Sequence, residues 1–299
     1  MMARGEGFLP RVLSHVTRTR SVLVVTLGDV LLDVVVRLGE SLVPGADVPA
    51  LIRTGTGGQA ANVAAWAAAL GANARCVAKR GVDQAGELAG ADLAGRGVEV
   101  VGPTVPSANG VVVSIVGRDG DRTMASDRGV APDLRPEELD PSWFAGADVL
   151  HLSGYSLLRS PIDSAAERAV ALARAGDTRV SVDLSAWPAI RAYGPVRFRE
   201  RLDALAPDLV FANEAEWEIV GGSYLPAPLA VIKRGARGIT IVSEEARLDL
   251  APVSGDVVDA TGAGDALAAG FLLGGSLEEA GRRGLDAAAR CVAQLGAMP

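Results

Sequence analysis

The second half of the chain alternates short apolar runs with longer amphipathic segments, and this pattern restricts the fold more than any other feature. The runs predicted as strands are Val149–Leu152, Arg179–Asp183, Leu209–Ala212, Leu229–Lys233 and Ile239–Val242. Helices are predicted over Pro161–Ala175 and Val196–Leu205, and two more follow Asp265. Repeated β-α units with short connections build a parallel sheet covered by helices on both faces. The sequence therefore predicts a three-layer, doubly wound α/β fold.

The first half begins in the same way. Val22–Leu27 is a continuous apolar run, which is typical of a central parallel strand covered on both faces. Further strands are predicted at Arg75–Lys79 and Val98–Val101, with helical segments between them. No linker divides the chain, so residues 21–299 are predicted to form a single domain. Residues 1–20 lack the apolar run of a signal peptide and are expected to be a loosely ordered extension.

A second, smaller sheet is predicted from a hairpin. Val111–Val116 and Arg122–Ser126 flank the dipeptide Asp119-Gly120, which favours a tight hairpin turn. Weaker strand patterns at Val34–Arg37 and Ala50–Arg53 are expected to pair with this hairpin. Segments 34–56 and 108–128 would then form a lid over the carboxyl edge of the main sheet.

The segment from Asp256 to Gly275, DVVDATGAGDALAAGFLLGG, is the first to indicate chemistry. Gly262 and Gly264 allow a sharp turn, and an apolar helix follows. The unpaired N–H groups and the dipole at a helix start favour an anion. A carboxylate at that position, Asp265, is either a capping residue or a catalytic residue. This segment alone favours neither interpretation over the other.

A second glycine turn precedes the helix predicted within Gly55–Ala72. Gly55, Gly57 and Ala60 match the spacing G-x-G-x-x-A of dinucleotide-binding sites. The match is weak, because no firm strand precedes it and no acidic residue follows about 20 positions later. Asn62, in the first helical turn, either faces a ligand at the glycine turn or is an ordinary polar residue.

Polar groups follow several predicted strands. They are Asp33, Asn213 with Glu216, Lys233 with Gly235, and the turn Gly262–Asp265. The carboxyl ends of parallel strands converge on one crevice, although Asp33 alone could equally be an edge-strand charge facing water. An anion hole, a carboxylate inside it and a separate acidic pair suit phosphoryl transfer. Walker-type and protein-kinase motifs are absent from the sequence.

Composition excludes several other classes. A net charge of −7 argues against nucleic acid as the main partner. Cys76 and Cys291 lie in apolar surroundings and are expected to be buried thiols rather than a disulfide. His15 and His151 are the only histidines and form no cluster, which argues against zinc hydrolysis and Ser–His chemistry.

A membrane span is also not expected. Ser21–Val36 is the most apolar stretch, but Asp29 and Asp33 interrupt it and it is shorter than a span of about 20 residues requires. We expect a buried strand there, no membrane partner and a cytoplasmic protein.

Four sequence blocks occur in the order GGQAAN, NEAE, KRGARG and DATGAGD. With this set the chain resembles the ribokinase-like sugar kinases, or PfkB carbohydrate kinases, over residues 22–299. The resemblance implies a ribokinase-like fold with a β-sheet lid. It also implies transfer of a phosphoryl group from ATP, with Mg²⁺, to a hydroxyl of a small sugar or sugar derivative, usually a primary CH₂OH.

The resemblance assigns roles to individual residues. Asp265 corresponds to the general base, and Gly262, Ala263 and Gly264 correspond to the anion hole. The positions that bind the sugar are Asp33, Gly57, Gly58, Gln59 and Asn62. Asn213 and Glu216 match the motif that organises Mg²⁺ and phosphate through water, and Lys233 and Gly235 match the turn near the nucleotide. Asp259 and Thr261 match the loop that binds a monovalent cation, such as K⁺, in many members.

Two departures from the family pattern leave questions open. Gln59 replaces the lysine of many ribokinases, so ribose is not singled out as the acceptor. The chain after Gly296 lacks the residues that complete the cation site, so activation by K⁺ stays undecided. The acceptor is a pentose, a hexose, a 2-keto-3-deoxy sugar acid or a nucleoside, and the scarcity of lid aromatics ranks nucleosides below sugars. Lid strands of this kind often pair across a homodimer.

A sugar acid would need a cationic side chain in the pocket. The lid offers Arg53, Arg122 and Arg128, although such a residue is more often a solvated charge. Two rival classes remain, a dinucleotide-dependent oxidoreductase and a non-catalytic ligand-binding member. The first leaves NEAE and GAGD without roles, and the intact Asp265 argues against the second.

Overall fold

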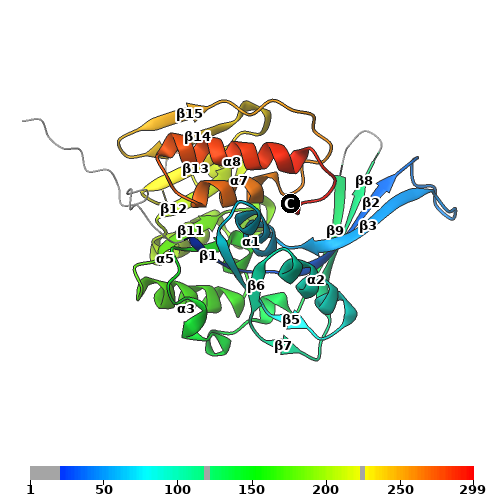
Figure 1. Cartoon of the computed structure of the whole chain (residues 1–299), viewed down its shortest axis with the longest axis horizontal. Helices are drawn as coiled ribbons and strands as arrows, with labels where there is room; N and C mark the ends of the chain where they lie inside the picture. The colour runs from blue at the N-terminus through cyan, green and yellow to red at the C-terminus, as the bar shows by residue number, and fades with distance from the viewer. Residues whose placement is uncertain (1–20, 118–121, 223–225) are drawn as a thin grey trace, which may run out of the picture.

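The computed structural model describes residues 21–117, 122–222 and 226–299, and its main feature is a nine-stranded, mostly parallel sheet (Figure 1). The strand order is β15-β14-β13-β12-β11-β10-β1-β4-β6. Their bounds are β1 (Leu23–Leu27), β4 (Asn73–Val77), β6 (Val98–Val101), β10 (Val149–Ser153), β11 (Arg179–Asp183), β12 (Leu209–Asn213), β13 (Leu229–Lys233), β14 (Ile239–Ser243) and β15 (Arg247–Leu250). Strands from β6 to β13 pair in parallel, and β14 and β15 add antiparallel strands at one edge.

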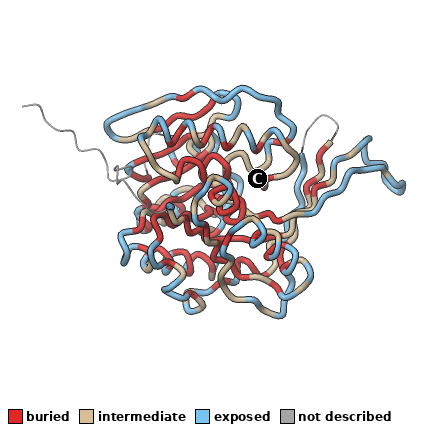
Figure 2. Tube along the Cα trace, in the orientation of Figure 1, coloured by how far each residue is buried: buried red, intermediate tan, exposed pale blue. Residues whose placement is uncertain are grey.

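Helices cover both faces of this sheet, and successive strand residues pack against opposite layers. Val24 packs in one core cluster and Val25 in the other, as the two-residue period of a strand requires. On the Val24 face lie α1 (Gln59–Ala69), α2 (Gln84–Gly95), α7 (Ala263–Leu272) and α8 (Leu277–Val292). On the Val25 face lie α3 (Ile162–Arg174), α4 (Trp187–Tyr193) and α5 (Pro195–Leu205). Figure 2 shows the buried residues concentrated along these strands and helices. The predicted doubly wound fold is confirmed.

A separate four-stranded sheet, called the small sheet below, projects from one end of the described part of the molecule (Figure 1). Its order is β3 (Ala50–Gly57), β2 (Leu31–Leu38), β8 (Asn109–Val116) and β9 (Arg122–Gly129). The predicted pairing of the hairpin strands with the two weaker patterns is therefore correct. The Asp119-Gly120 turn and the extension over residues 1–20 lie outside the described residues.

Several local predictions are wrong. Asp33 does not follow the end of a main-sheet strand, because it is the third residue of β2 in the small sheet. The weak strand pattern at Ala50–Arg53 extends further than predicted, since β3 runs up to Gly57 and directly precedes the glycine turn. Helix α4 and strand β15 were not predicted.

The structure bears on two further expectations, one about the cysteines and one about membrane-spanning helices. Cys76 and Cys291 are both buried and free, as predicted. Within the described ranges, none of the helices has the length and apolar character needed to cross a bilayer.

Candidate active site

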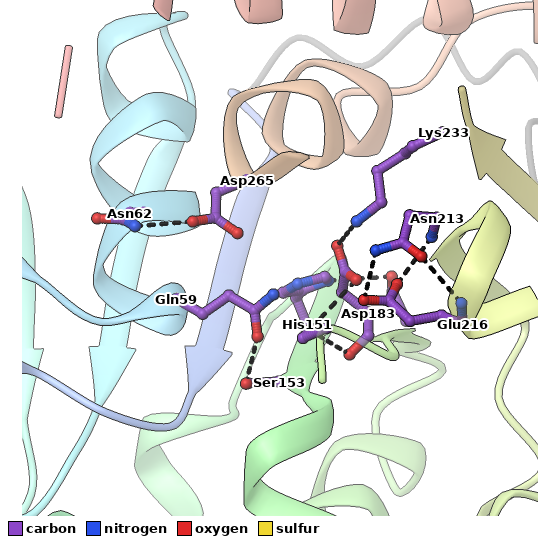
Figure 3. A network of polar contacts seen from close by, with 11 residues as sticks. Gln59, Asn62, His151, Ser153, Asp183, Asn213, Glu216, Lys233 and Asp265 are labelled. Carbon is purple, nitrogen blue, oxygen red and sulfur yellow. Dashed lines mark hydrogen bonds and ion pairs between the residues drawn. The ribbon is translucent and has the colours of Figure 1, made fainter. Parts of the chain in front are cut away.

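Two helix starts meet at the centre of the candidate site. Asn62, in the first turn of α1, donates a hydrogen bond of 2.7 Å from Nδ2 to Oδ2 of Asp265, in the first turn of α7 (Figure 3). Each helix begins after a glycine with positive φ, 95° at Gly58 and 75° at Gly262. The positive ends of both helix dipoles therefore lie beside the Asp265 carboxylate.

Close backbone contacts require glycine at both of these positions. A Cβ on Gly58 would lie 2.3 Å from the carbonyl oxygen of Asp29. A Cβ on Gly262 would lie 2.5 Å from Cβ of Ala297. A larger residue would push either helix start away from its support.

Asp265 has the electrostatics of a base that works near neutral pH. Burial raises the pKa of its carboxyl group to about 7, against the hydrogen bond from Asn62 and despite the nearby Lys233. The Asp183 carboxylate adds to the increase, and the Gln59 amide opposes it. A general base is most efficient when its pKa lies near the working pH.

Asn62 offers a second polar group at this point. Its Oδ1 is buried and has no hydrogen-bond partner among the described residues. Leaving a buried acceptor unpaired is costly, so the atom marks a place where a bound hydroxyl group can donate.

Lys233, the last residue of β13, reaches the start of α7. Its Nζ lies 2.6 Å from Oδ2 of Asp183, at the end of β11 (Figure 3). Burial lowers the pKa of Lys233, but the carboxylates of Asp183 and Glu216 outweigh this and the net shift is upward. A Cβ on Gly264 would lie 3.2 Å from the Lys233 ammonium, so glycine there lets the cation approach the helix start.

Asn213 and Glu216 form the cap of the short helix α6 (Glu214–Ile219). The side chain of Asn213 accepts from the Glu216 N–H at 2.9 Å, and Glu216 accepts from the Asn213 N–H at 2.7 Å. Asn213 Nδ2 also donates to Glu216 at 2.8 Å. Burial raises the pKa of the Glu216 carboxyl group, which lies near both Lys233 and Asp183. The motif thus places a buried carboxylate beside the Lys233–Asp183 pair.

The small sheet contributes charged groups to the same crevice. Arg122 of β9 donates to the hydroxyl of Thr261 and lies 3.9 Å from Asp259, both in the loop before α7. Burial raises the pKa of Asp33 to about 6, and the Arg122 charge opposes this increase. Asp33 and the loop before α7 therefore flank one arginine.

The loop before α7 is supported by residues that follow α8. Asp259 accepts from the backbone N–H of Thr261 at 2.9 Å and of Gly296 at 3.0 Å. Trp66 of α1 donates to the Ala297 carbonyl at 2.8 Å. The two contacts of Asp259 occupy both of its carboxylate oxygens with hydrogen-bond donors. Together with the Trp66 contact they support the loop that carries Gly262 and Gly264.

Arg128 is not a solvated charge. Its guanidinium donates to both oxygens of Asp29, at 2.6 and 2.8 Å, and stacks over the ring of Tyr155 at 5.6 Å. This planar pair joins the small sheet to the loop after β1. Arg53, in contrast, is exposed.

The structure brings most of the predicted residues together, but Gly235 lies in an exposed turn (Gly235–Arg237) after β13. Sequence reasoning missed Ser153, which donates to the side-chain oxygen of Gln59 (Figure 3). It noticed Asp183 only as a carboxylate ending a strand. The place of Asp183 at the end of a predicted strand was a signal for its role in the site. The residues around Ser153 gave no comparable signal for its contact with Gln59.

No group of three or more His, Cys, Asp or Glu side chains in the described part of the chain is arranged to hold a metal ion. Asp183 ends β11, and Glu216 lies in the first turn of α6, directly after the neighbouring strand β12. Their carboxylates are oxygen ligands of the kind that Mg²⁺ prefers, and they would fit an ion whose other ligands are substrate phosphates and water.

Comparisons with known proteins agree with this geometry. The sequence pattern described as "pfkB family carbohydrate kinase" matches residues 22–299. The ATP-dependent ribose-1-phosphate kinase of Halopiger xanaduensis is 35% identical over 263 residues, which cover 83% of each chain. The crystal structure of adenosine kinase from Sinorhizobium meliloti has a TM-score of 0.83 and 27% identity, covering 94% of this chain and 96% of that one.

A third comparison concerns the fold alone. An Escherichia coli protein thought to be ribokinase II was solved in complex with ATP and Mg²⁺. It has a TM-score of 0.79 and 20% identity, covering 93% of this chain and 94% of that one.

Proposed function

Because the chain belongs to the pfkB family of carbohydrate kinases and is an ATP-dependent carbohydrate kinase, we propose that Asp265 is its general base. The reaction transfers the γ-phosphoryl group of ATP to a hydroxyl of a small sugar or sugar derivative. The observation that carries this proposal is the buried Asp265 carboxylate, held by Asn62 where α1 and α7 begin.

On the acceptor side, a primary hydroxyl donates its proton to the Asp265 carboxylate. Its oxygen attacks the γ-phosphorus while the bond to the β,γ-bridging oxygen breaks, and ADP leaves. The unpaired Oδ1 of Asn62 accepts a hydrogen bond from a neighbouring sugar hydroxyl. Asp33 and the Gly57–Gln59 turn bind the rest of the acceptor beneath the small sheet.

On the phosphate side, the N–H groups of Gly262, Ala263 and Gly264 stabilise the charge that develops during transfer. Lys233 adds a positive charge at the same helix start, since Gly264 leaves room for its ammonium. The nucleotide lies toward Lys233 and Gly235. Asn213 and Glu216 would orient the water ligands of Mg²⁺, and the bound ion would supply positive charge next to the phosphates. An E. coli protein of the same fold was solved with ATP and Mg²⁺, which supports ATP and Mg²⁺ as the nucleotide and metal of the proposed reaction.

The small sheet acts as a lid in this proposal. Residues 21–299 act as one catalytic unit in this proposal, and the described parts of segments 34–56 and 108–128 cover the acceptor. The contacts of Arg122 with Thr261 and of Arg128 with Asp29 support a closed position over the crevice. Closure excludes water, which would otherwise compete with the sugar as phosphoryl acceptor.

A coupled assay for ADP formation tests the function. Purified protein with ATP and Mg²⁺ is offered D-ribose, D-fructose, 2-keto-3-deoxygluconate, ribose-1-phosphate and adenosine, with and without EDTA. ADP formation that depends on one acceptor and on the metal is expected. Binding of ATP without turnover on any acceptor would instead support a non-catalytic ligand-binding protein.

A nucleoside is the second candidate acceptor, because the S. meliloti structure is that of an adenosine kinase. The strands of the small sheet carry no Phe, Trp or Tyr to stack on a base, which favours a sugar. The oxidoreductase alternative loses its basis, since the glycine fingerprint needs a parallel β-α-β unit and β3 pairs antiparallel with β2.

A further inference from the structure

The loop before α7 carries a negative charge next to the start of that helix. Asp259 precedes Gly262 by three residues and is 8% exposed, so its carboxylate is largely shielded from water. Gly262 is the N-cap of α7, whose first N–H groups we assign to the transferred phosphoryl group. An unbalanced carboxylate at this place would repel the phosphates of ATP, so the loop needs a positive partner.

A monovalent cation such as K⁺ can supply that charge only where oxygen atoms are free to bind it. The carboxylate oxygens of Asp259 already accept hydrogen bonds from the protein. Oδ1 accepts from the N–H and the hydroxyl of Thr261, and Oδ2 accepts from the N–H of Gly296 at 3.0 Å. Three donors thus occupy most of the lone pairs of this carboxylate.

The backbone carbonyl oxygens around the loop are occupied as well. The Thr261 carbonyl accepts from the thiol of Cys291 at 3.2 Å, and the Val292 carbonyl accepts from the N–H of Asp259 at 3.2 Å. The Ala297 carbonyl accepts from an indole N–H at 2.8 Å. A bound K⁺ would have to displace these donors, so the residues present do not fit a monovalent cation.

The positive charge at this loop comes from the small sheet instead. Arg122, the first residue of β9, donates from Nη1 to the hydroxyl oxygen of Thr261, and the same nitrogen lies 3.9 Å from Oδ1 of Asp259. The Thr261 hydroxyl uses its single hydrogen toward Asp259, so its oxygen can accept from Arg122. The guanidinium charge therefore offsets that of the carboxylate, directly and through the hydroxyl between them.

We propose that Arg122 is a positioning residue, whose guanidinium takes the place of a bound monovalent cation at the Asp259–Thr261 loop. The loop then needs no K⁺, and its charge is balanced only while the small sheet lies over the crevice. This inference rests on the proposed role of Gly262–Asp265 in phosphoryl transfer. It links the electrostatics of the phosphate site to the sheet that covers the acceptor.

The first test needs no substrate. Thermal unfolding of the wild type is compared in KCl and in tetramethylammonium chloride at equal ionic strength. A cation that binds the folded state raises the unfolding midpoint, and a cation that does not bind leaves it unchanged. Equal midpoints in the two salts are expected. A saturable rise in KCl alone would overturn the proposal.

Turnover tests the role of the guanidinium. With the acceptor that gives the highest kcat/KM in the panel, Arg122→Met should lower kcat about tenfold or more, because the loop charge is then unbalanced. Arg122→Lys keeps the charge and should retain most of the turnover. Guanidinium chloride below denaturing concentrations should restore turnover to Arg122→Met, whereas urea, a neutral molecule of similar shape, should not. Wild-type kcat in Arg122→Met, or equal rescue by urea, would contradict the proposal.

Arg135 supplies the matched control. Its guanidinium also lies 3.9 Å from a carboxylate, that of Glu137, but both side chains of this pair are exposed. Arg135→Met removes the same charge from the protein and should keep wild-type kcat. An equal loss in Arg135→Met and Arg122→Met would mean that net charge alone matters, which also contradicts the proposal.

A double-mutant cycle tests whether Arg122 acts through Asp259. Asp259→Asn removes the negative charge, so adding Arg122→Met to it should lower kcat by a smaller factor than in the wild type. The same factor in both backgrounds would show that Arg122 acts on the substrates directly, and the positioning role would be lost.

The unfolding and kinetic results separate this inference from the proposed function. If none of the acceptors in the panel is phosphorylated, the proposed function fails, and the unfolding comparison still decides whether K⁺ binds. An active kinase that requires K⁺, with wild-type kcat in Arg122→Met, would overturn the inference about Arg122 alone.

Discussion

The ammonium nitrogen of Lys233 lies 2.6 Å from a carboxylate oxygen of Asp183, a residue that is fully buried at the end of β11. The contact joins the ends of two main-sheet strands separated by β12. It keeps the cation beside Gly264, at the start of the helix that carries Asp265. Before ATP binds, the charge of Lys233 is thus balanced by a protein carboxylate.

The Lys233–Asp183 ion pair predicts that the effects of two single substitutions on the free energy of unfolding do not add up in the double variant. Asp183→Asn or Lys233→Met alone leaves a buried charge unpaired and should lower the free energy of unfolding by about 3 kcal/mol. The double variant removes both charges and should be more stable than either single variant. Urea unfolding at pH 7.5 measures all four proteins, and additive losses would contradict a direct ion pair.

The second prediction concerns turnover. Asp265→Asn keeps the shape of the side chain but removes its basicity, so kcat should fall by about 10²–10⁴-fold. The dissociation constant for ATP, measured by calorimetry, should change by less than about threefold. Asp286→Asn, an exposed change in α8, is the control and should retain wild-type kcat. Wild-type turnover by Asp265→Asn would exclude this residue as the base.

The third prediction follows from the raised pKa of Asp265. The carboxylate must be ionised to accept a proton, and its pKa is about 7. Below that pH, kcat/KM should fall about tenfold per pH unit, and above it the profile should level off. A profile measured from pH 5 to 9 with saturating Mg²⁺ checks this, and a midpoint near 4 would contradict it.

The raised pKa of Asp265 also makes the free energy of unfolding depend on pH. Between pH 4 and pH 7 the folded state keeps the Asp265 proton that the unfolded chain has released, so this residue makes the protein less stable as pH rises. Asp265→Asn should therefore be more stable than the wild type at pH 8, on the order of 2–4 kcal/mol, and nearly equal to it at pH 4. Urea unfolding at the two pH values distinguishes this from a stabilisation that is independent of pH.

The fifth prediction compares two glycines of β3. A Cβ on Gly57 would lie 2.0 Å from the Asp33 carboxylate, whereas a Cβ on Gly55 has no atom within 4 Å among the described residues. Gly57→Ala should displace Asp33 and raise the KM for the sugar about tenfold or more, the scale of a hydrogen bond to a charged group. Gly55→Ala should leave it unchanged, and the KM for ATP should be constant in both variants.

The sequence allowed the main sheet to be predicted because its inner strands are continuous apolar runs. Strand β15 was missed because its pattern is short: Arg247 and Asp249 alternate with Leu248 and Leu250 over four residues only. For β3 the sequence contains only the weak pattern at Ala50–Arg53, because most of the strand is exposed, and pairing with β2 extends it to Gly57. Such elements depend on distant partners rather than on local pattern.

In the candidate site, too, local features could be predicted from the sequence, whereas contacts between distant elements could not. Asp265 and its glycines could be proposed from one segment, because the turn and the helix start are local features. The partners Asn62, Asp183 and Ser153 come from three other elements, and their contacts arise only after the chain has folded. For Arg128 the sequence favours a solvated charge over a pocket residue, because its partner Asp29 is 99 residues away.

The hydrogen bond between Asn62 and Asp265 joins residues 203 positions apart. A ribosome adds about 5–20 residues per second, so roughly 10–40 s separate the synthesis of these two residues. During that interval the nascent chain already carries the Gly57–Gln59 turn, but not the carboxylate that we propose as the general base. Translation that stops before α7 therefore releases a polypeptide that cannot consume ATP by this route.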